Sequence, residues 1–408
     1  MTVADRSWAE KFAARTRGGV GGGLASILAL AGDKKAIPFA GGFPDPSTFP
    51  EHELTDLVRG IIDANDSSAL QYAPTGGLPG PLDYISGRLG ANEGRTPTDG
   101  ELMITSGTIE ALELAGKAFL DPGDLVMVEA PTYLGAIMAF KSFQADLEAL
   151  PMDEGGLQIE ALEASLADGR IPKLLYTIPD HQNPGGVSLV ADRRERLVEL
   201  ARRYGFVIVE DVAYRELSFH GATGACLWAL GADVVVQAGT FSKLFFPGVR
   251  LGWAAGPPEI VSQLVLAKQN TDQCAGALGQ RLLEDYGRRG LLDRQIELSC
   301  ELYRQRCDLM LAALGEHMPN GVSWTRPRGG FFSWVTLPPG LDAAELAVVA
   351  QSRGVTFVPG APFFPDGRGA DNLRLSYSRV EDHLISEGVR RLAAVIEEST
   401  GRLRGGES

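Results

Sequence analysis

Short apolar runs and amphipathic segments alternate through the middle of the chain. The runs predict buried strands at residues 101–105, 125–129, 174–178, 206–210 and 234–237. Between them, apolar positions recur every three or four residues, which predicts helices at 109–120 and 192–204 and a further helix that opens at Tyr133. Strands that alternate with helices favour a mainly parallel sheet with helices on both of its faces.

The segment before this alternation is less regular. A helix is predicted to begin near Trp8, with Trp8 and Phe12 on one face, and a second helix covers residues 24–31. Residues 18–23 between them hold five glycines and Val20, which a helix tolerates only at a large entropic cost, so we expect a loop there. This loop has neither the preceding strand nor the following Lys-Ser/Thr of a phosphate-binding P-loop.

The next residues lead into the alternating region. After the apolar run 36–39 comes a Gly/Pro-rich entry loop at 40–50, followed by a predicted helix at 51–64. Tyr72 then lies on a turn-rich loop that precedes another helix.

Beyond residue 258 the pattern changes. Residues 259–314 read as helical for a long way. The tail mixes short strands and helices, at 322–325, 330–337, from 343, 355–358, 373–376 and 381–398. We therefore predict three parts: an N-terminal segment with a glycine-rich lid (1–50), a large domain (51–300) and a small α+β domain (301–408).

Composition narrows the class of protein. The 408 residues are 44% hydrophobic and 22% charged, which is typical of a soluble globular protein. The formal net charge is −14 without a basic block, so we expect neither nucleic acid nor an anionic membrane as the main partner. No apolar run reaches the roughly 18–20 residues of a membrane-spanning helix, and the amino terminus lacks the apolar core of a signal peptide. The four cysteines have no metal-type spacing, so we expect no metal site and a reducing, cytoplasmic location.

Candidate chemical groups follow the predicted strands. In parallel sheets ligands bind at the carboxyl ends of strands. Small residues and free backbone N–H groups that open a helix can hold a phosphate. The residues at such positions are Ser106, Gly107 and Thr108 at a helix start, Tyr133, Asn183 in a Pro/Gly turn, and Asp211 with Tyr214 after it.

Lys243 is the most distinctive of these groups. It lies in GTFSKLFFPGVRLGW, among Thr240 and Ser242, two Phe, a Pro-Gly turn and Arg250. Desolvation in such surroundings disfavours the ammonium form and lowers its pKa, as a Schiff-base lysine requires. The alternative, a lysine that extends from a loop into solvent, stays open on this stretch alone.

Together these groups match the needs of pyridoxal 5'-phosphate (PLP). That cofactor requires a lysine for its aldehyde, a carboxylate for its ring nitrogen, donors for its phenolic oxygen and a phosphate cradle. Lys243, Asp211 and the pair Asn183 and Tyr214 would meet the first three needs. The cradle would be formed by Ser106, Gly107, Thr108, Thr240, Ser242 and Arg250.

Several motifs carry a resemblance to a known family. They include AGGFPDPSTFP, LQYAPTGG, DPGDLVMVEAPTY, IPDHQNPGG, VEDVAYREL, RPRGGFFSWV and NLRLSYS. The chain resembles the fold-type I PLP enzymes, class I/II aminotransferases, in the 2-aminoadipate and kynurenine branch. The resemblance implies an α/β fold, with a mainly parallel sheet between helices in the large domain and a small α+β domain. It also implies a homodimer with shared active sites.

The resemblance also implies roles for individual residues. By it, Lys243 would be the Schiff-base lysine and proton carrier, Asp211 the partner of the ring nitrogen, and Arg374 the clamp on the substrate carboxylate. The remaining assignments are Asn183 and Tyr214 on the phenolic oxygen, Tyr133 stacked on the ring, Tyr72 on the neighbouring subunit's phosphate, and Gly41 and Gly42 along the substrate pocket.

Some positions depart from the family pattern. NPTG becomes NPGG at residues 183–186, and PTEG becomes PTGG at 74–77. Relatives that accept an acidic side chain tend to carry an arginine where Gly18 stands here, after Arg15 and Arg17, which argues against adipate-like specificity. His181 replaces an aromatic residue; it could fill the same space or act as an acid or base.

Transfer of an amino group between an α-amino acid and a 2-oxo acid is the function that this resemblance implies. An alternative uses the same carbanion for β- or γ-elimination, replacement or carbon–carbon bond formation on a bulkier amino acid, such as S-adenosylmethionine. The arginine-poor glycine segment motivates that alternative. The branch also supplies effector domains of DNA-binding regulators, but we see no room for a winged helix, and the acidic charge argues against that role.

Overall fold

A computed structural model describes residues 8–17, 35–64, 67–220 and 223–405. The glycine segment 18–23 and the helix predicted at 24–31 lie outside the described residues. Within the described ranges, no helix has both the length and the apolar character needed to cross a membrane.

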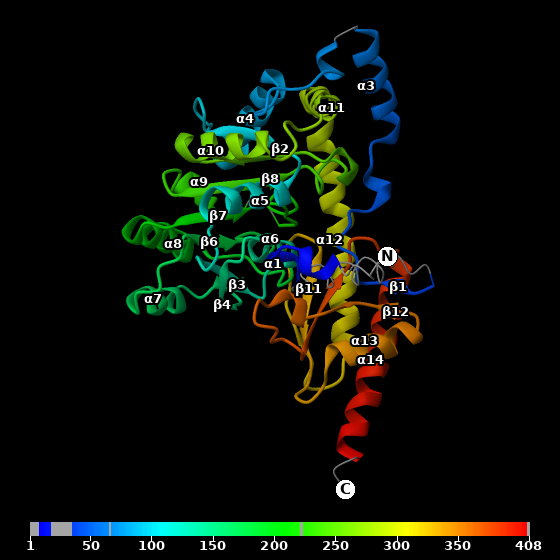
Figure 1. The fold of residues 1–408 in the computed structure, drawn as a ribbon. Coiled ribbons are helices and arrows are strands. Elements are labelled where there is room, and N and C mark those ends of the chain that lie inside the picture. Colours follow the sequence, from blue (N-terminus) through cyan, green and yellow to red (C-terminus); the bar gives the residue numbers. More distant parts are fainter. Residues whose placement is uncertain (1–7, 18–34, 65–66, 221–222, 406–408) are drawn as a thin grey trace, which may run out of the picture.

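A large sheet of eight strands forms the centre of the molecule (Figure 1). In spatial order its strands are β2 (Leu102–Thr105), β9 (Gly252–Ala255), β8 (Val235–Thr240), β7 (Val207–Asp211), β6 (Leu174–Thr177), β3 (Leu125–Ala130), β4 (Asp146–Asp153) and β5 (Gly156–Leu157). The β8, β7, β6, β3 and β4 strands are paired in parallel, whereas β9 is antiparallel to both of its neighbours. The mainly parallel sheet predicted from the sequence is therefore confirmed.

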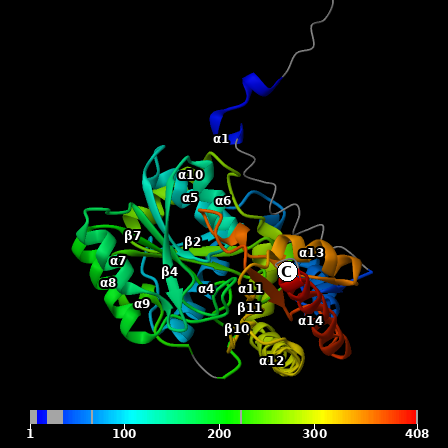
Figure 2. The same ribbon diagram turned by 90° about the horizontal axis from the view of Figure 1, so that it is seen from below.

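Helices cover both faces of this sheet. They are α4 (Pro79–Glu93), α5 (Thr108–Phe119), α6 (Leu134–Ser142), α7 (Ile159–Ala167), α8 (Ala191–Tyr204), α9 (Leu227–Leu230) and α10 (Pro258–Gln269). Alternate strand residues point to opposite faces. Val128, Tyr176 and Val209 pack with residues of α5 and α6, whereas Met127 and Ile208 belong to the core that includes α7, α8 and α9. Figure 2 shows these two helical layers on either side of the strands.

A second, four-stranded sheet is built from the C-terminal part of the chain. Its strands are β10 (Ser323–Trp324), β11 (Phe332–Thr336), β14 (Asn372–Ser376) and β13 (Val358–Pro359), and all their pairings are antiparallel. The helices α13 (Ala343–Ser352) and α14 (Asp382–Gly405) accompany it. The small α+β unit is thus confirmed, while the domain bounds at residues 50 and 300 stay predictions.

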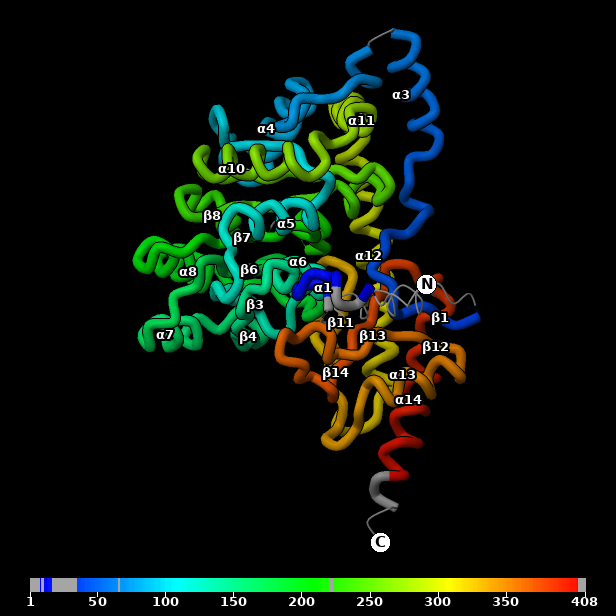
Figure 3. The backbone as a smooth tube through the Cα atoms, in the orientation of Figure 1, coloured from blue at the N-terminus to red at the C-terminus, as the bar shows by residue number. Residues whose placement is uncertain are grey.

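Two segments far apart in sequence meet beside this small sheet. The β1 strand (Ile37–Pro38) pairs in parallel with β12 (Val355–Thr356), so the entry loop lies against the C-terminal part of the chain (Figure 3). The backbone N–H of Ser376 donates to Phe39 O at 2.8 Å, which holds residues 39–43 next to β14. This contact holds the Gly41-Gly42 pair close to β14, where a Cβ on Gly42 would lie 3.9 Å from Arg374 Nη2.

The sequence missed some boundaries. The segment 259–314 is not one long helix but α10, α11 (Ala277–Arg288) and α12 (Leu291–His317), because residues 270–276 and the αL residue Gly290 interrupt the helical path. Residues 355–358 contribute to two sheets, as β12 and β13. The elements that were not predicted include the strands β4, β5 and β9 and the helices α7 and α9. The helices α1 (Ala14–Arg17) and α3 (Glu51–Asp63) complete the fold.

Candidate active site

A cavity of about 320 Å³ opens where β6, β7 and β8 end and where β11 and β14 of the small sheet approach. Most of the residues predicted from the sequence meet there. Those that line the cavity are Gly42, Thr108, Tyr133, Asn183, Asp211, Tyr214, Thr240, Ser242, Lys243, Arg250 and Arg374. The strand ends of the parallel sheet, the entry loop and β14 thus bring together groups that are up to 332 positions apart in the chain (from Gly42 to Arg374).

Lys243 lies in the tight turn after β8. Phe241, Leu244 and Phe245 around it are buried, and Phe241 N–H donates to Leu251 O at 2.9 Å, which fixes the turn. The Nζ atom of Lys243 donates to Gly42 O at 2.9 Å. Burial, together with the positive charges of Arg374 and Arg250, lowers the pKa of Lys243 to about 8, although Asp211 opposes the shift. An appreciable fraction of this lysine is therefore a neutral amine near pH 7.

Asp211 ends β7 and is almost fully buried. Its Oδ2 accepts a hydrogen bond from the hydroxyl of Tyr176 at 2.8 Å, and its Oδ1 accepts from the N–H of Ala213 at 3.0 Å. Burial raises the pKa of Asp211 to about 6, although these hydrogen bonds and Lys243 favour the charged form. The carboxylate is thus largely ionised at pH 7 and is held in one orientation.

Arg374 occupies the opposite side of the cavity, in β14. Its Nη1 donates to Asn183 Oδ1 at 2.8 Å and its Nη2 to Ala40 O at 3.1 Å, while its Nε has no partner among the described residues. The guanidinium lies over the rings of Phe332 and Phe363, 4.2 and 4.9 Å from their centroids. Burial lowers the pKa of Arg374 to about 10, which still leaves it charged at neutral pH. Arg374 is therefore a buried cation whose Nε–H group is available to a further acceptor.

Two tyrosines line the cavity between these charges. Tyr133 precedes α6, and a Cβ on Gly135 would come within 2.5 Å of its ring, so the glycine leaves the space that the ring occupies. Tyr214 contacts Phe331 and Phe332 edge-on, at 5.4 and 5.7 Å between centroids. Burial raises the pKa of Tyr133 to about 12 and that of Tyr214 further, so both hydroxyls keep their protons at neutral pH.

A cradle for an anion forms at the start of α5. Gly107 has a φ of +108°, and a Cβ there would lie 3.0 Å from Arg250 Nη2, so the position favours glycine. The hydroxyl of Thr108 is buried without a partner among the described residues. Arg250 Nη1 donates to Ser242 Oγ at 3.0 Å. Free donors at a helix start, beside an arginine, suit a phosphate group.

Some predicted residues lie outside the cavity lining. Gly41 is buried next to Gly42, and Gly107 lies against the guanidinium of Arg250. Ser106 touches the cradle through its carbonyl oxygen, which accepts from Arg250 Nη2 at 2.7 Å. Tyr72 is 77% exposed and is not brought to this cavity. The sequence assigned it to a neighbouring subunit, so its role stays a prediction.

Sequence reasoning missed the group that orients Asp211. Tyr176 belongs to the buried strand β6, and its side chain is completely buried. A buried tyrosine hydroxyl needs a hydrogen-bond partner, and the adjacent strand ends in an acid. The tyrosine in this buried strand could therefore have indicated a hydrogen bond to Asp211. The aromatic residues Phe332 and Phe363 gave no such signal, because apolar residues in strands and loops usually pack in the core.

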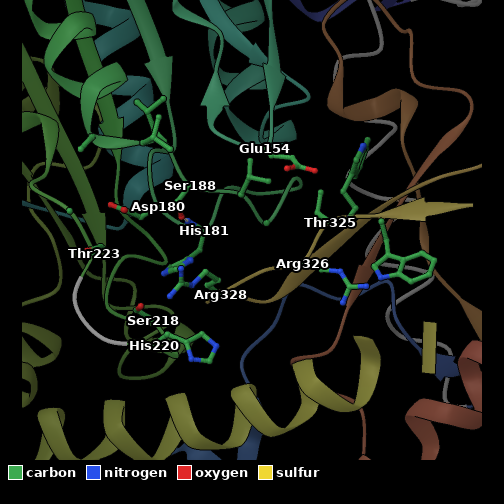
Figure 4. Close-up of a pocket in the computed structure, with 18 of the residues that line it drawn as sticks. Glu154, Asp180, His181, Ser188, Ser218, His220, Thr223, Thr325, Arg326 and Arg328 are labelled. Atoms are coloured by element: carbon green, nitrogen blue, oxygen red, sulfur yellow. Dashed lines mark hydrogen bonds between the residues drawn. The ribbon is translucent and has the colours of Figure 1, made fainter. Parts of the chain in front are cut away.

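A larger cavity, of about 860 Å³, lies elsewhere between the two sheets (Figure 4). His181 lines it and is absent from the lining of the cavity that holds Lys243. A Cβ on Gly329 would come within 2.4 Å of the imidazole ring, so the ring packs on this glycine. Burial lowers the pKa of His181 to about 4, and neither ring nitrogen has a partner among the described residues. These contacts favour the space-filling role over acid/base chemistry.

The donor set of the smaller cavity fits pyridoxal 5'-phosphate. It offers an amine with a lowered pKa, an oriented carboxylate, protonated phenols and a cradle whose buried Thr108 hydroxyl awaits a partner. The fold and this cavity define a PLP-dependent enzyme of fold type I.

Comparisons with known proteins identify the family. The sequence pattern of aminotransferase class I and II matches residues 42–392. Aromatic-amino-acid aminotransferase 1 of Thermococcus litoralis is 39% identical over 381 residues, which cover 92% of this chain and 91% of the relative. The chain belongs to the aminotransferase class I and II family, and it is a PLP-dependent aminotransferase.

Solved structures give the same result. The kynurenine aminotransferase of Pyrococcus horikoshii, in complex with PMP, superposes with a TM-score of 0.92 at 38% identity, covering 96% of this chain and 98% of that one. The α-aminoadipate aminotransferase of Thermus thermophilus, complexed with N-(5'-phosphopyridoxyl)-L-leucine, has a TM-score of 0.90 at 36% identity and covers 96% and 99%. The chain is therefore similar to the 2-aminoadipate and kynurenine branch that its motifs indicated.

Proposed function

We propose that this aminotransferase uses Lys243 as its Schiff-base lysine and takes an apolar or aromatic α-amino acid as donor. When bound, PLP supplies an aldehyde that accepts the amino group and a ring that withdraws electrons from the substrate Cα. Lys243 holds the aldehyde carbon and then, as a free amine, moves the proton between Cα and C4' of the cofactor. Its lowered pKa of about 8 suits both tasks.

Asp211 and the two phenols hold the cofactor ring in this proposal. The Asp211 carboxylate keeps a proton on the pyridine nitrogen, and Tyr176 keeps that carboxylate oriented by a 2.8 Å hydrogen bond. Tyr214 and Asn183 would hold the phenolic oxygen of the cofactor, and Tyr133 would contact its ring. Thr108, Ser242 and Arg250 bind the phosphate with the backbone N–H groups at the start of α5.

The charges in the cavity support the donor class. Its lining contains three cations, Lys243, Arg250 and Arg374. In this proposal Lys243 takes the aldehyde, Arg250 the phosphate and Arg374 the carboxylate of the substrate. The described residues supply no further cation to this lining for an acidic side chain. The remaining wall is apolar, with Phe43, Ile109, Leu134, Phe332 and Phe363. An apolar wall without a spare charge favours an apolar or aromatic side chain, as in the relative from T. litoralis.

The protein forms a homodimer in this proposal, and Tyr72 reaches the phosphate of the neighbouring subunit's cofactor. Leu70 and Tyr72 are 70% and 77% exposed, so two large side chains within three residues stand in solvent in the isolated chain. Burial against a second copy would remove them from water. A cytoplasmic location agrees with four cysteines that are all free.

A half-reaction tests the donor class. The purified holoenzyme is mixed with single amino acids, and conversion of its cofactor from the aldehyde to the amine form is followed by absorbance. We expect conversion with phenylalanine, tyrosine or leucine to be at least about tenfold more efficient than with 2-aminoadipate or glutamate, since burying an unpaired carboxylate is costly. Preference for the acidic donors would contradict the apolar class. Release of ammonia without the amine form would instead indicate elimination.

Arg374 is expected to control substrate capture. The variant Arg374→Ala removes the only cation that the described part of the lining places on the β14 side of the cavity, and KM for the amino acid should rise on the order of 100-fold. The cofactor affinity should change little, because Arg250 serves the phosphate. Steady-state kinetics and cofactor titration separate the two effects. The control Arg368→Ala removes a half-exposed arginine that pairs with Asp366, and it should leave KM unchanged. If the variant bound the cofactor more weakly but kept its KM for the amino acid, the assignment of Arg374 to the substrate site would be wrong.

A further inference from the structure

A charged cluster around a buried lysine lies next to the start of α5, outside the cavity lining. At its centre is Lys268 of α10, whose side chain is 0% exposed. The Nζ atom donates to both carboxylate oxygens of Glu110 at 2.6 and 2.7 Å and to both oxygens of Asp272 at 2.8 and 2.9 Å. A buried ammonium needs such partners. Glu110 is 10% exposed and Asp272 34% exposed, so the pairing is buried mainly on the Glu110 side.

The cluster is connected to the cradle through Ser106. The backbone N–H of Ser106 donates to Glu110 Oε2 at 2.6 Å, and its hydroxyl donates to Asp272 Oδ2 at 3.1 Å. Both of the donors that the sequence would assign to a phosphate thus bind carboxylates in this structure. The carbonyl oxygen of the same residue accepts from Arg250. Ser106 therefore transmits the arrangement of the cluster to the cradle.

Two carboxylates at this place oppose phosphate binding. The N-terminus of a helix attracts anions, so Glu110 and Asp272 can compete with a phosphate for the free N–H groups at the start of α5. They also repel its charge. Burial raises the pKa of Glu110. Lys268 is the cation that draws both acids together and toward α10.

We propose that Lys268 is a positioning residue for the phosphate of the cofactor. It neutralises part of the acidic charge and holds Glu110 and Asp272 on the Ser106 side of the helix start, so that the donors of Gly107 and Thr108 stay available. This inference rests on the phosphate cradle assigned under the proposed function. A purely structural role, in which Lys268 only fastens α10 to α5, predicts no selectivity for phosphate.

Affinities for PLP and for pyridoxal, which lacks the phosphate, test the inference. The full-length protein is freed of cofactor by dialysis and titrated with each compound. For Lys268→Met we expect PLP to bind at least about tenfold more weakly, because one positive charge near a dianion is lost, while pyridoxal affinity changes little. Equal loss for both compounds, or no loss for PLP, would overturn the proposal.

Lys117→Met is the matched control. Lys117 is an exposed lysine of α5 whose Nζ donates to Thr271 Oγ1 at 2.6 Å. It is not the ion-pair partner of Glu110 or Asp272, so the variant removes the same charge from the same neighbourhood and leaves the Lys268 cluster paired. We expect both affinities to stay at the wild-type value. A phosphate-selective loss as large as that of Lys268→Met would show that bulk charge, not the cluster, controls binding.

A rescue experiment distinguishes the loss of the Lys268 charge from structural damage caused by the substitution. In the triple variant Lys268→Met, Glu110→Gln, Asp272→Asn the acids are neutral, so PLP affinity should recover relative to Lys268→Met. Failure to recover would refute the electrostatic role. If Lys268→Met does not fold, Glu110→Gln with Asp272→Asn tests the same idea while Lys268 is retained, and it should raise PLP affinity over pyridoxal; a decrease would refute it. If the wild-type protein did not prefer PLP to pyridoxal, the assignment of the phosphate cradle itself would be refuted.

Discussion

Replacing Lys243 by alanine is expected to reduce turnover on the order of 10⁴-fold or more. The variant loses both the amine that joins the aldehyde carbon and the group that moves the proton at Cα, and each is a large contribution. The fold should survive, because Phe241, Leu244 and Phe245 hold the turn and the Lys243 side chain faces the cavity. Single-turnover kinetics with added amino acid and circular dichroism measure the two parts of this expectation.

The absorbance of the bound cofactor and its reductive fixation provide independent measurements. Borohydride should attach the cofactor to wild-type Lys243, as peptide mapping would show, and should attach nothing to the Lys243→Ala protein. The control Lys141→Ala removes a lysine that donates to Pro365 O, away from the cavity lining, and should behave as wild type. Cofactor fixed to another lysine in the wild-type protein would refute the assignment of Lys243.

Much of the large sheet was predictable because its strands are short apolar runs with clear helical segments between them. The predicted run at 125–129 became β3 (Leu125–Ala130), and 174–178 became β6 (Leu174–Thr177). The edge hairpin β4–β5 was missed, since its strand DLEALPMD mixes exposed and half-buried positions and lacks an apolar run. An edge strand is shaped by its neighbour as much as by its own composition.

The site was predictable where chemistry depends on rare residue types at strand ends. Lys243, Asp211 and Arg374 meet in one cavity because parallel strands end at one edge and β14 approaches it. The direction of a side chain was not predictable. Ser106 seemed a phosphate ligand from its place before a helix, yet its amide and hydroxyl bind Glu110 and Asp272. Those partners lie within α5 and 166 residues away, and only the packing of α10 on α5 brings the second of them near.

Buried polar residues of the core also depend on three-dimensional neighbours. Glu210 and Asp211 are adjacent acids in one strand, and only Asp211 was predicted to hold a cofactor. In the structure they point to opposite faces. Glu210 accepts from the N–H groups of Leu227 and Trp228 at 2.7 and 3.0 Å and so fixes the start of α9. Only Asp211 reaches the cavity.

This pair allows a sharp test of the ring-nitrogen assignment. Asp211→Asn keeps the size of the side chain but removes the charge that would hold a proton on the pyridine nitrogen. We expect turnover to fall on the order of 10²–10³-fold, the usual cost of losing one preorganised electrostatic partner. Cofactor should still bind and be fixed by borohydride, because Lys243 and the phosphate cradle remain. Stability should change little, since the amide oxygen can still accept from the Ala213 N–H while the amide NH2 donates to the hydroxyl oxygen of Tyr176.

Glu210→Gln is the matched control, one residue earlier in the same strand and equally buried. It should keep its turnover, because its side chain faces α9 and not the cofactor. Turnover, cofactor fixation and thermal unfolding of the two variants are measured together. The assignment requires that activity follow position 211 alone. If Asp211→Asn stayed fully active, or if both variants lost activity in proportion to stability, the carboxylate would be a structural acid and the electron-withdrawing ring would need another partner.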